Sequence, residues 1–376
     1  MIRSIEVVKD NIRVSSEPRV PRTSSVTACP LCGGSKAALL FRGPDRLCGT
    51  PGEFLYRRCA SCLTVFQDPR VISEDLHLCY PEGYLTHVPP TTLPSVSDSR
   101  RPLSRFRERL RSAIVEAVQG QPATGVLGRI GRLLASSRYL RERAFNDCVP
   151  DVLLPLKPGK IRALEIGCGS GVLLRGLAQV GWDAEGIEVD PIAAQLAREV
   201  SGQPVREGDF RKIALQSGSY DLVVLNHVLE HLEDPIFALT RTRELLAPGG
   251  RVALFYPNPA ALGAKIYGAE WLAWDVPRHL VIPTWRALAK QARRSSLVPI
   301  QVRSTARTAE GVLAHSRAYR KGQSVVLGDY SPTVYDRSLA LLERALVWFG
   351  FFVGEEIIME LRASDDEESV AGAMSQ

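Results

Sequence analysis

The sequence of 376 residues has no apolar run long enough to cross a lipid bilayer. Its longest such run extends from Ala345 to Gly354, well short of the roughly 20 residues that a membrane-spanning helix needs. The first residues, MIRSIEVVKDNIRV, also lack the apolar core and the small-residue cleavage site of a secretory leader. We therefore expect a cytoplasmic protein, in which paired cysteines are better suited to metal ligation than to disulfide bonds.

Strong charge of either sign and internal repeats are also missing. Charged residues make up 23% of the chain, hydrophobic residues 45%, and the net charge is +6. This composition supports a sizeable core and is ordinary for a soluble protein. The modest positive charge fits an anionic partner and leaves a nucleotide sugar, a lipid headgroup and RNA open.

Composition divides the chain into five segments. Residues 1–25 are polar and predict a flexible lead-in, and residues 26–82 contain two Cys-x-x-Cys pairs. Residues 83–159 begin rich in Pro, Ser and Thr and continue as Arg-rich helical sequence, which indicates a linker and helical region. Residues 160–363 alternate apolar runs with helical patterns, and the acidic tail 364–376 predicts disorder.

The alternation in residues 160–363 predicts an α/β fold. Four apolar runs are typical of buried strands, namely IRALEIG, DAEGIEVD, SYDLVVLN and RVALFYP. Helical sequence lies between them. Such alternation implies crossover connections, so we expect a Rossmann-like, doubly wound, mainly parallel sheet. LVPIQVRS and EEIIMELR predict two more strands. A small zinc-ribbon-like module at the N-terminus and a helical linker complete the expected fold.

A glycine loop follows the first of these strands. It reads Glu165-Ile-Gly167-Cys-Gly169-Ser-Gly171, where glycine allows positive φ and close approach of a ligand. A dehydrogenase loop has G-x-G-x-x-G and a Walker loop has Lys-Ser/Thr after its last glycine, and neither pattern is present. Glu188 ends the second strand, where a carboxylate can accept both hydroxyls of a ribose.

Four features occur in a fixed order along the chain: E-x-G-x-G-x-G, the acidic end of the second strand, DLVVLNHVLEHLEDP and LAPGG. With them, residues 160–362 resemble class I methyltransferases, which implies S-adenosyl-L-methionine as methyl donor. The competing interpretation is a Rossmann-like domain that has lost its cofactor. By resemblance, the cofactor would contact Glu165, Gly167 and Gly169 at its methionine end, Glu188 at the ribose, Asp209 near the adenine amino group, and also Gly171 and Asn226.

Two knuckles precede this region, Cys29-Pro-Leu-Cys32 and Cys59-Ala-Ser-Cys62. Four thiolates in two such pairs predict one structural Zn²⁺. Unligated thiols or a labile disulfide are the alternatives. Together with the following Y-P-E-G-Y, the module is similar to that of bacterial methyltransferases in nucleotide-sugar and surface-polysaccharide pathways. In this resemblance, Tyr80 and Tyr84 match the aromatic positions of those proteins. A ribosomal-RNA methyltransferase is another zinc-bearing relative.

Acid–base candidates follow the third and fourth strands. Transfer to an oxygen needs removal of its proton, and His231 is the preferred base, with Glu230 or His227 to orient it. A helical turn would place His227 and His231 on one face, although the EH pair could also be purely structural. His279, in W-x-x-D-x-P-R-H-L, is the second candidate base. Its neighbour Arg278 fits either an anionic ligand or a structural ion pair with an aspartate.

The motif Asn/Asp-Pro-Pro-aromatic after the third strand is absent, which argues against methylation of an exocyclic base amine. We favour a small-molecule acceptor: a sugar, a glycan or a lipid-linked intermediate. The alternatives are an RNA methyltransferase that grips RNA through its zinc module, and a noncatalytic cofactor-binding or scaffold protein. For Arg-rich residues 100–111 we favour a solvated helix face, while contact with RNA or an anionic membrane surface stays open. The oligomeric state is undetermined.

The replacement Glu188→Ala should weaken the binding of S-adenosylmethionine about tenfold or more. A charge-assisted hydrogen bond to the ribose is worth about 1.5–3 kcal/mol, and each 1.4 kcal/mol corresponds to a factor of ten in affinity. Calorimetric titration of the cofactor measures the change. Equal affinity for both proteins would remove Glu188 from the cofactor site.

Overall fold

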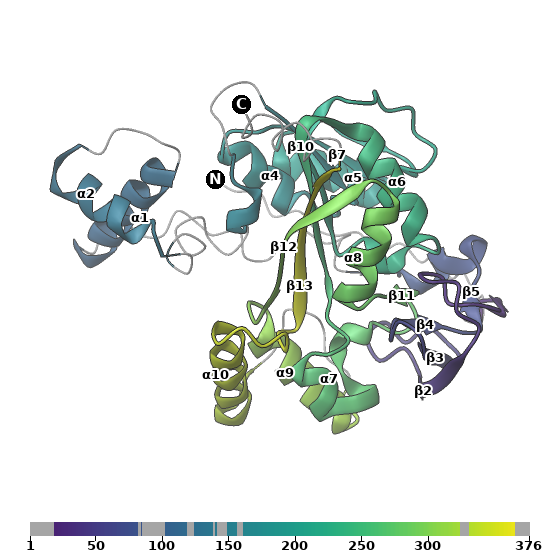
Figure 1. Cartoon of the computed structure of the whole chain (residues 1–376). Coiled ribbons are helices and arrows are strands. Elements are labelled where there is room, and N and C mark those ends of the chain that lie inside the picture. Colours follow the sequence, from purple (N-terminus) through teal and green to yellow (C-terminus); the bar gives the residue numbers. More distant parts are fainter. Residues whose placement is uncertain are drawn as a thin grey trace, which may run out of the picture.

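The computed structural model describes residues 19–81, 84, 102–118, 124–137, 140, 149–155, 161–323 and 331–364. Its centre is a seven-stranded sheet of order β12-β13-β10-β9-β6-β7-β8. The strands are β6 (Arg162–Ile166), β7 (Asp183–Glu188), β8 (Val205–Glu207), β9 (Tyr220–Asn226), β10 (Leu246–Pro257), β12 (Leu297–Thr305) and β13 (Glu356–Ala363). Strands β8, β7, β6, β9 and β10 pair parallel, whereas β13 pairs antiparallel with β10 and β12, so that six of the seven strands run in the same direction. The predicted mainly parallel sheet is confirmed (Figure 1).

Helices cover both faces of this sheet because successive strand side chains point to opposite sides. In β9, Val223 and Leu225 enter one core, and Leu222 and Val224 enter the other. The first face carries α6 (Pro235–Leu245) and α8 (Trp285–Arg294), and the second carries α4 (Val172–Gln179) and α5 (Pro191–Ser201). The sheet is thus buried between helices, as its almost continuously apolar strands require.

Other helices lie beyond these layers. The linker region forms α1 (Pro102–Val118) and α2 (Gly125–Leu134), while α7 (Leu262–Tyr267), α9 (Ala309–Arg320) and α10 (Val334–Trp348) gather at one end of the sheet (Figure 1). Short 3₁₀ helices are η1 (Ser73–Cys79), η3 (Asp151–Leu153), η4 (Leu229–His231), η5 (Gly268–Glu270) and η6 (Leu272–Trp274). Among the described residues, no helix combines the length and apolarity needed to span a membrane.

The N-terminal module shares a sheet with the rest of the chain. Strands β2 (Ala37–Gly43), β3 (Phe54–Cys59) and β4 (Val65–Gln67) pair antiparallel, and β11 (Val281–Ile282) adds itself to β4. Val281 pairs with Phe66 and Ile282 with Val65. A strand from the predicted segment 160–363 therefore completes the sheet of the predicted segment 26–82, and the two segments are one packed structure.

The flexible lead-in predicted for residues 1–25 is wrong for its last residues. Strand β1 (Thr23–Ser24) pairs with β5 (Arg70–Val71), and Arg22 donates to the Asp75 carboxylate at 2.7 and 2.9 Å. These contacts tie the start of the described chain to the module. Residues 1–18, most of 82–101 and the predicted tail 365–376 lie outside the described residues.

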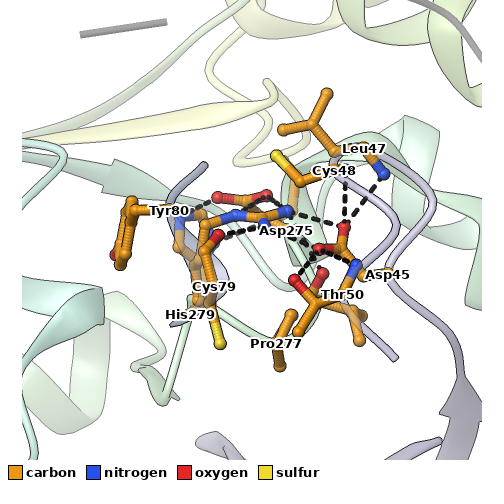
Figure 2. Close-up of polar contacts among 12 residues, drawn as sticks. Asp45, Leu47, Cys48, Thr50, Cys79, Tyr80, Asp275, Pro277 and His279 are labelled. Carbon is orange, nitrogen blue, oxygen red and sulfur yellow. Dashed lines mark hydrogen bonds and ion pairs between the residues drawn. The ribbon is translucent and has the colours of Figure 1, made fainter. Parts of the chain in front are cut away.

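A buried arginine joins the module to the sheet. The Arg278 side chain is fully buried, and its Nη1 and Nη2 donate to the two carboxylate oxygens of Asp45 at 2.8 and 2.9 Å. Its Nε and Nη2 donate to Asp275 at 2.9 and 2.7 Å, and Nη1 donates to the Cys79 carbonyl at 2.9 Å. Figure 2 shows Asp45 and Asp275 in this network, with His279 and Tyr80 beside it. The sequence left Arg278 either as a ligand for an anion or as a partner in a structural ion pair with an aspartate, and the structure shows the ion pair.

The Asp45 carboxylate is held from several directions. Its oxygens also accept from the backbone N–H groups of Leu47, Cys48 and Thr50 and from the Thr50 hydroxyl. Burial opposes the ionisation of Asp45, but hydrogen bonds from Arg278 outweigh it and hold the pKa of Asp45 below its ordinary value. A charged pair with all its oxygens satisfied is the arrangement in which a buried ion pair is tolerated.

We predict that Asp45→Asn lowers the free energy of unfolding by about 3–5 kcal/mol, because it leaves a buried guanidinium with one carboxylate fewer. Chemical denaturation measures the change. Glu53→Gln breaks the exposed 3.5 Å pair between Arg42 and Glu53 and serves as the matched control, with an expected loss below about 1 kcal/mol. Equal losses in the two variants would contradict a special role for the buried pair.

Candidate active site

The glycine loop between β6 and α4 has the conformation that its sequence predicts. Gly167 and Gly171 have φ of +68° and +78°. A Cβ atom at Gly167 would lie 2.5 Å from a Val228 methyl group, and one at Gly171 would lie 2.7 Å from the Ala197 carbonyl oxygen. Both positions therefore require glycine, for backbone conformation and for space.

Glu188 ends β7 directly beside this loop. Its Oε2 accepts from the Gly169 N–H at 2.8 Å, and its Oε1 accepts from the N–H groups of Val189 and Asp190 at 2.8 and 3.1 Å. These donors fix the carboxylate at the carboxyl end of the sheet, where nucleosides bind in such folds. The position agrees with the ribose role that the resemblance implies, and that role stays a prediction.

Glu165 is a buried carboxylate that needs a partner. Only 2% of its surface is exposed, and its Oε2 has no hydrogen-bond partner among the described residues. Burial, with a further contribution from Glu188, holds the pKa of Glu165 well above its ordinary value. A cationic ligand would reverse this penalty, so the ammonium of a methionine moiety fits here.

Asp209 and Asn226 line one cavity together with the glycine loop and Glu188. Asp209 accepts from Arg211 Nε at 2.8 Å and from Nη2 at 2.7 Å, so its carboxylate already has a cationic partner. Asn226 is the last residue of β9. Both residues lie where a cofactor would extend from the loop, but the predicted contact of Asp209 with an adenine remains a prediction.

One cavity of about 2240 Å³ joins the glycine loop to the histidines and to the end helices. Its lining runs from Glu165 and Glu188 past His231 to Phe351. Pockets for a single drug-sized ligand usually measure about 300–1,000 Å³. The cavity is therefore large enough for a nucleoside cofactor and a second, sizeable molecule.

His231 projects into this cavity from η4, just beyond β9. Its Nδ1 lies 3.1 Å from the Arg278 carbonyl oxygen and 3.0 Å from the Tyr80 hydroxyl. A carbonyl oxygen can only accept, so Nδ1 carries the proton and Nε2 carries the lone pair. With the proton assigned to Nδ1 through this contact, Nε2 of His231 can act as a general base. Tyr80 and Arg278 orient it, in place of the predicted Glu230 or His227.

His279 lies against His231, with ring centroids 4.6 Å apart and ring planes at 75°. Its Nδ1 lies 3.0 Å from the Ala273 carbonyl oxygen, so Nε2 again carries the lone pair. Burial and the neighbouring His231 lower the pKa of His279 to about 4. His279 is therefore neutral at pH 7, and it is a weak base compared with an ordinary histidine.

His227 does not have the conformation that we predicted. Its φ of 54° takes it out of a right-handed turn, and only Leu229–His231 form a short helix. Nδ1 lies 3.0 Å from Glu230 Oε1, and Nε2 lies 2.8 Å from Glu356 Oε1. Burial opposes the charged form, but both carboxylates raise the pKa of His227 to about 10. The prediction of a helix face shared with His231 is wrong, and His227 is a cation held between carboxylates.

Sequence reasoning missed two residues of this network, Glu356 and Arg307. Arg307 Nη2 donates to Glu356 at 3.3 Å, and Glu356 in turn contacts His227. Burial opposes ionisation of Glu356, but Arg307 and His227 outweigh it and lower its pKa to about 2. The one signal in the sequence was the pair of glutamates that opens the apolar run EEIIMEL.

Within the described part of the chain, two groups of side chains could hold a metal ion. Glu230, His231 and His279 offer ligand atoms within 4.8 Å of one another, a donor set that suits a divalent cation. The thiols of Cys29, Cys32, Cys59 and Cys62 also converge within 4.8 Å. In this second group, the Cys29–Cys62 and Cys32–Cys59 sulfur atoms are each 3.6 Å apart. Tetrahedral Zn–S bonds of about 2.3 Å give sulfur separations of about 3.8 Å, so the four thiols fit such an ion.

Comparison with known proteins agrees with this geometry. Residues 137–302 match a family described as a methyltransferase domain. The ubiquinone biosynthesis O-methyltransferase of Cereibacter sphaeroides (strain ATCC 17025) is 33% identical over 147 residues, which cover 37% of this chain and 60% of that protein. Its counterpart in Xanthomonas axonopodis pv. citri is 34% identical over 131 residues, 33% of this chain and 55% of that protein. The chain thus spans somewhat more than half the length of these relatives.

Solved structures show partial likeness. A methyltransferase of Haloferax volcanii, solved with the activator Trm112, has a TM-score of 0.43 and 18% identity, and it covers 62% of this chain and 96% of its own. An S-adenosylmethionine-dependent methyltransferase of Mesorhizobium loti has a TM-score of 0.38 and 16% identity, with coverage of 61% and 99%.

Proposed function

We propose that this chain transfers the methyl group of S-adenosylmethionine to a hydroxyl oxygen of a small-molecule acceptor, since residues 137–302 match a family described as a methyltransferase domain. The observation that carries this proposal is that one cavity is lined by both the glycine loop and His231. The two relatives above are named O-methyltransferases, which supports oxygen as the acceptor atom.

The chain's own residues would align the two reactants and accept a proton. S-adenosylmethionine supplies an electrophilic methyl group, and transfer is an in-line displacement whose rate depends on alignment. Glu165 and Glu188 would hold the donor, one at its ammonium and one at its ribose. The Nε2 of His231 would take the proton as the acceptor oxygen attacks, while Tyr80 and the Arg278 carbonyl keep the imidazole in place.

The acceptor end of the cavity favours a molecule with an apolar portion. Its lining includes the apolar residues Val302, Val312, Leu341, Phe351 and Phe352, among polar ones such as Arg303, Arg307 and His315. Apolar walls favour apolar ligand surface by the hydrophobic effect. Among the expected acceptors, a lipid-linked intermediate agrees with these walls better than a free sugar or a glycan.

We predict that His231→Ala lowers turnover about a hundredfold or more, the usual contribution of a positioned base, while cofactor affinity stays nearly unchanged. Transfer of labelled methyl groups to fractionated cell extract measures turnover. His279→Ala is the matched control and should cost less, because His279 is the weaker base.

Three results would contradict this assignment. Normal turnover of the His231 variant would show that alignment alone suffices. A loss confined to the His279 variant would move the base to that residue, and a rate that requires an added divalent cation would assign both histidines to metal ligation. Cofactor binding without any turnover by the unmodified chain would favour the noncatalytic alternative, and strongly salt-dependent RNA binding the RNA methyltransferase.

The four-cysteine group supports a structural zinc ion, which we also propose. The metal would hold the first knuckle, which precedes β2, against the second, which begins at the last residue of β3. The Cys29 and Cys59 side chains are buried in the same core as Phe66 and Leu280. Zinc would therefore stabilise the region on which Arg278 and β11 pack.

Purified protein should contain about one zinc ion per chain, and Cys32→Ser or Cys62→Ser should release it and lower the thermal midpoint, because metal binding supplies folding free energy to such a module. Metal analysis and calorimetry measure both effects. Cys48→Ser, which changes a cysteine outside the group, should keep the metal. The absence of zinc from protein prepared without chelator would refute the proposal.

A further inference from the structure

Helix α10 presents its apolar side to solvent. At 100° per residue, Val334, Tyr335, Leu341, Leu342, Ala345, Trp348 and Phe349 fall within an arc of about 140°. Leu341 is 62% exposed, Phe349 70% and Trp348 81%, and Phe351 continues the patch just beyond the helix. We call these exposed residues the α10 face. Contiguous exposed apolar surface of this kind marks an interaction site.

The opposite side of α10 packs Ala340, with Leu339 and Val347, into a hydrophobic core and is also held by polar contacts. Asp336 is buried, caps the helix with Thr333 and accepts from Arg317 Nε at 2.9 Å. Glu343 is also buried and accepts from the Glu355 N–H at 3.0 Å. Because these contacts fix the rotation of the helix, the outward position of the apolar residues is a property of the fold.

The α10 face continues into the proposed acceptor cavity. Leu341, Ala345, Trp348 and Phe351 belong to the face and also line the cavity. Because Trp348 is both exposed and part of the lining, this face lies at an opening of the cavity. A partner on the α10 face would therefore lie where an acceptor can enter.

Arginines border the same face. Arg337 and Arg344 follow the edge of the apolar arc seven residues apart, and both are exposed. Glu310 lies 3.4 Å from Arg337 and 4.0 Å from Arg344, and such exposed pairs are weak enough to exchange for another anion. Apolar and aromatic residues flanked by arginines are the composition of helices that lie in the interface of an anionic bilayer.

We infer that α10 docks in the plane of an anionic membrane surface and opens the cavity toward the bilayer, so that an amphiphilic acceptor enters directly from the lipid. This inference rests on the proposed function for the identity of the acceptor site, but not for the docking itself. A second copy of the chain is the alternative occupant. It would cover the cavity opening and has no need of the arginine border.

Co-sedimentation of the full chain with lipid vesicles tests the docking. We expect binding to vesicles of phosphatidylcholine mixed with phosphatidylglycerol, and much weaker binding to phosphatidylcholine alone. The double variant Leu342→Ser/Phe349→Ser changes two residues of the α10 face outside the cavity lining, and it should weaken binding about tenfold or more. Leu39→Ser, at an exposed position of β2, is the matched control and should bind as the unmodified chain does.

Calorimetric binding of S-adenosylmethionine checks that the double variant is folded. Arg337→Glu provides a second test, since it should weaken binding to the anionic vesicles only. Because the vesicle assay contains neither cofactor nor acceptor, its result is independent of whether the chain transfers methyl groups. The inference would be overturned if the unmodified chain and the double variant bound vesicles equally, or if neither bound. It would also be overturned if the unmodified chain formed a dimer without lipid and the double variant were a monomer.

Discussion

The buried ion pair between Arg278 and Asp45 is the contact on which the candidate active site depends. A guanidinium without water must keep its carboxylates, so Asp45 in the N-terminal module and Asp275 beyond β10 are held on either side of it. The Arg278 carbonyl also orients His231, and His279 is the next residue along the chain. One short segment thereby fixes both histidines against the module, which supplies Tyr80 to the same site.

The N-terminal module is consequently a wall of the site. Strand β11 extends its sheet directly after the histidine segment, and the Thr284 hydroxyl just beyond β11 donates to the carbonyl of Cys62, one of the four cysteines, at 2.9 Å. A metal ion there would act on the chemistry only through packing, by keeping Asp45 and Tyr80 in position. This arrangement explains how a structural ion could matter for a reaction in which it takes no part.

The sequence predicted those features that depend on near neighbours. The mainly parallel sheet followed from the apolar runs and their spacing, the loop from Gly167 and Gly171, and the thiol cluster from its two knuckles. Contacts between distant residues were out of reach. Asp45 and Arg278 are 233 residues apart, and His227 and Glu356 are 129 apart. The left-handed backbone of His227 and the outward apolar side of α10 also run against the local pattern, because tertiary contacts decide both.

Amide hydrogen exchange of the full chain, with and without the proposed zinc ion, tests this dependence most directly. Local exchange reports the stability of each region, so removal of the ion by a chelator shows what the module supports. We expect faster exchange in residues 29–81 and also in 228–232 and 271–282, while residues 162–188 keep their protection. Loss of protection confined to residues 29–62 would contradict the central claim, because the histidines would then be held without the module.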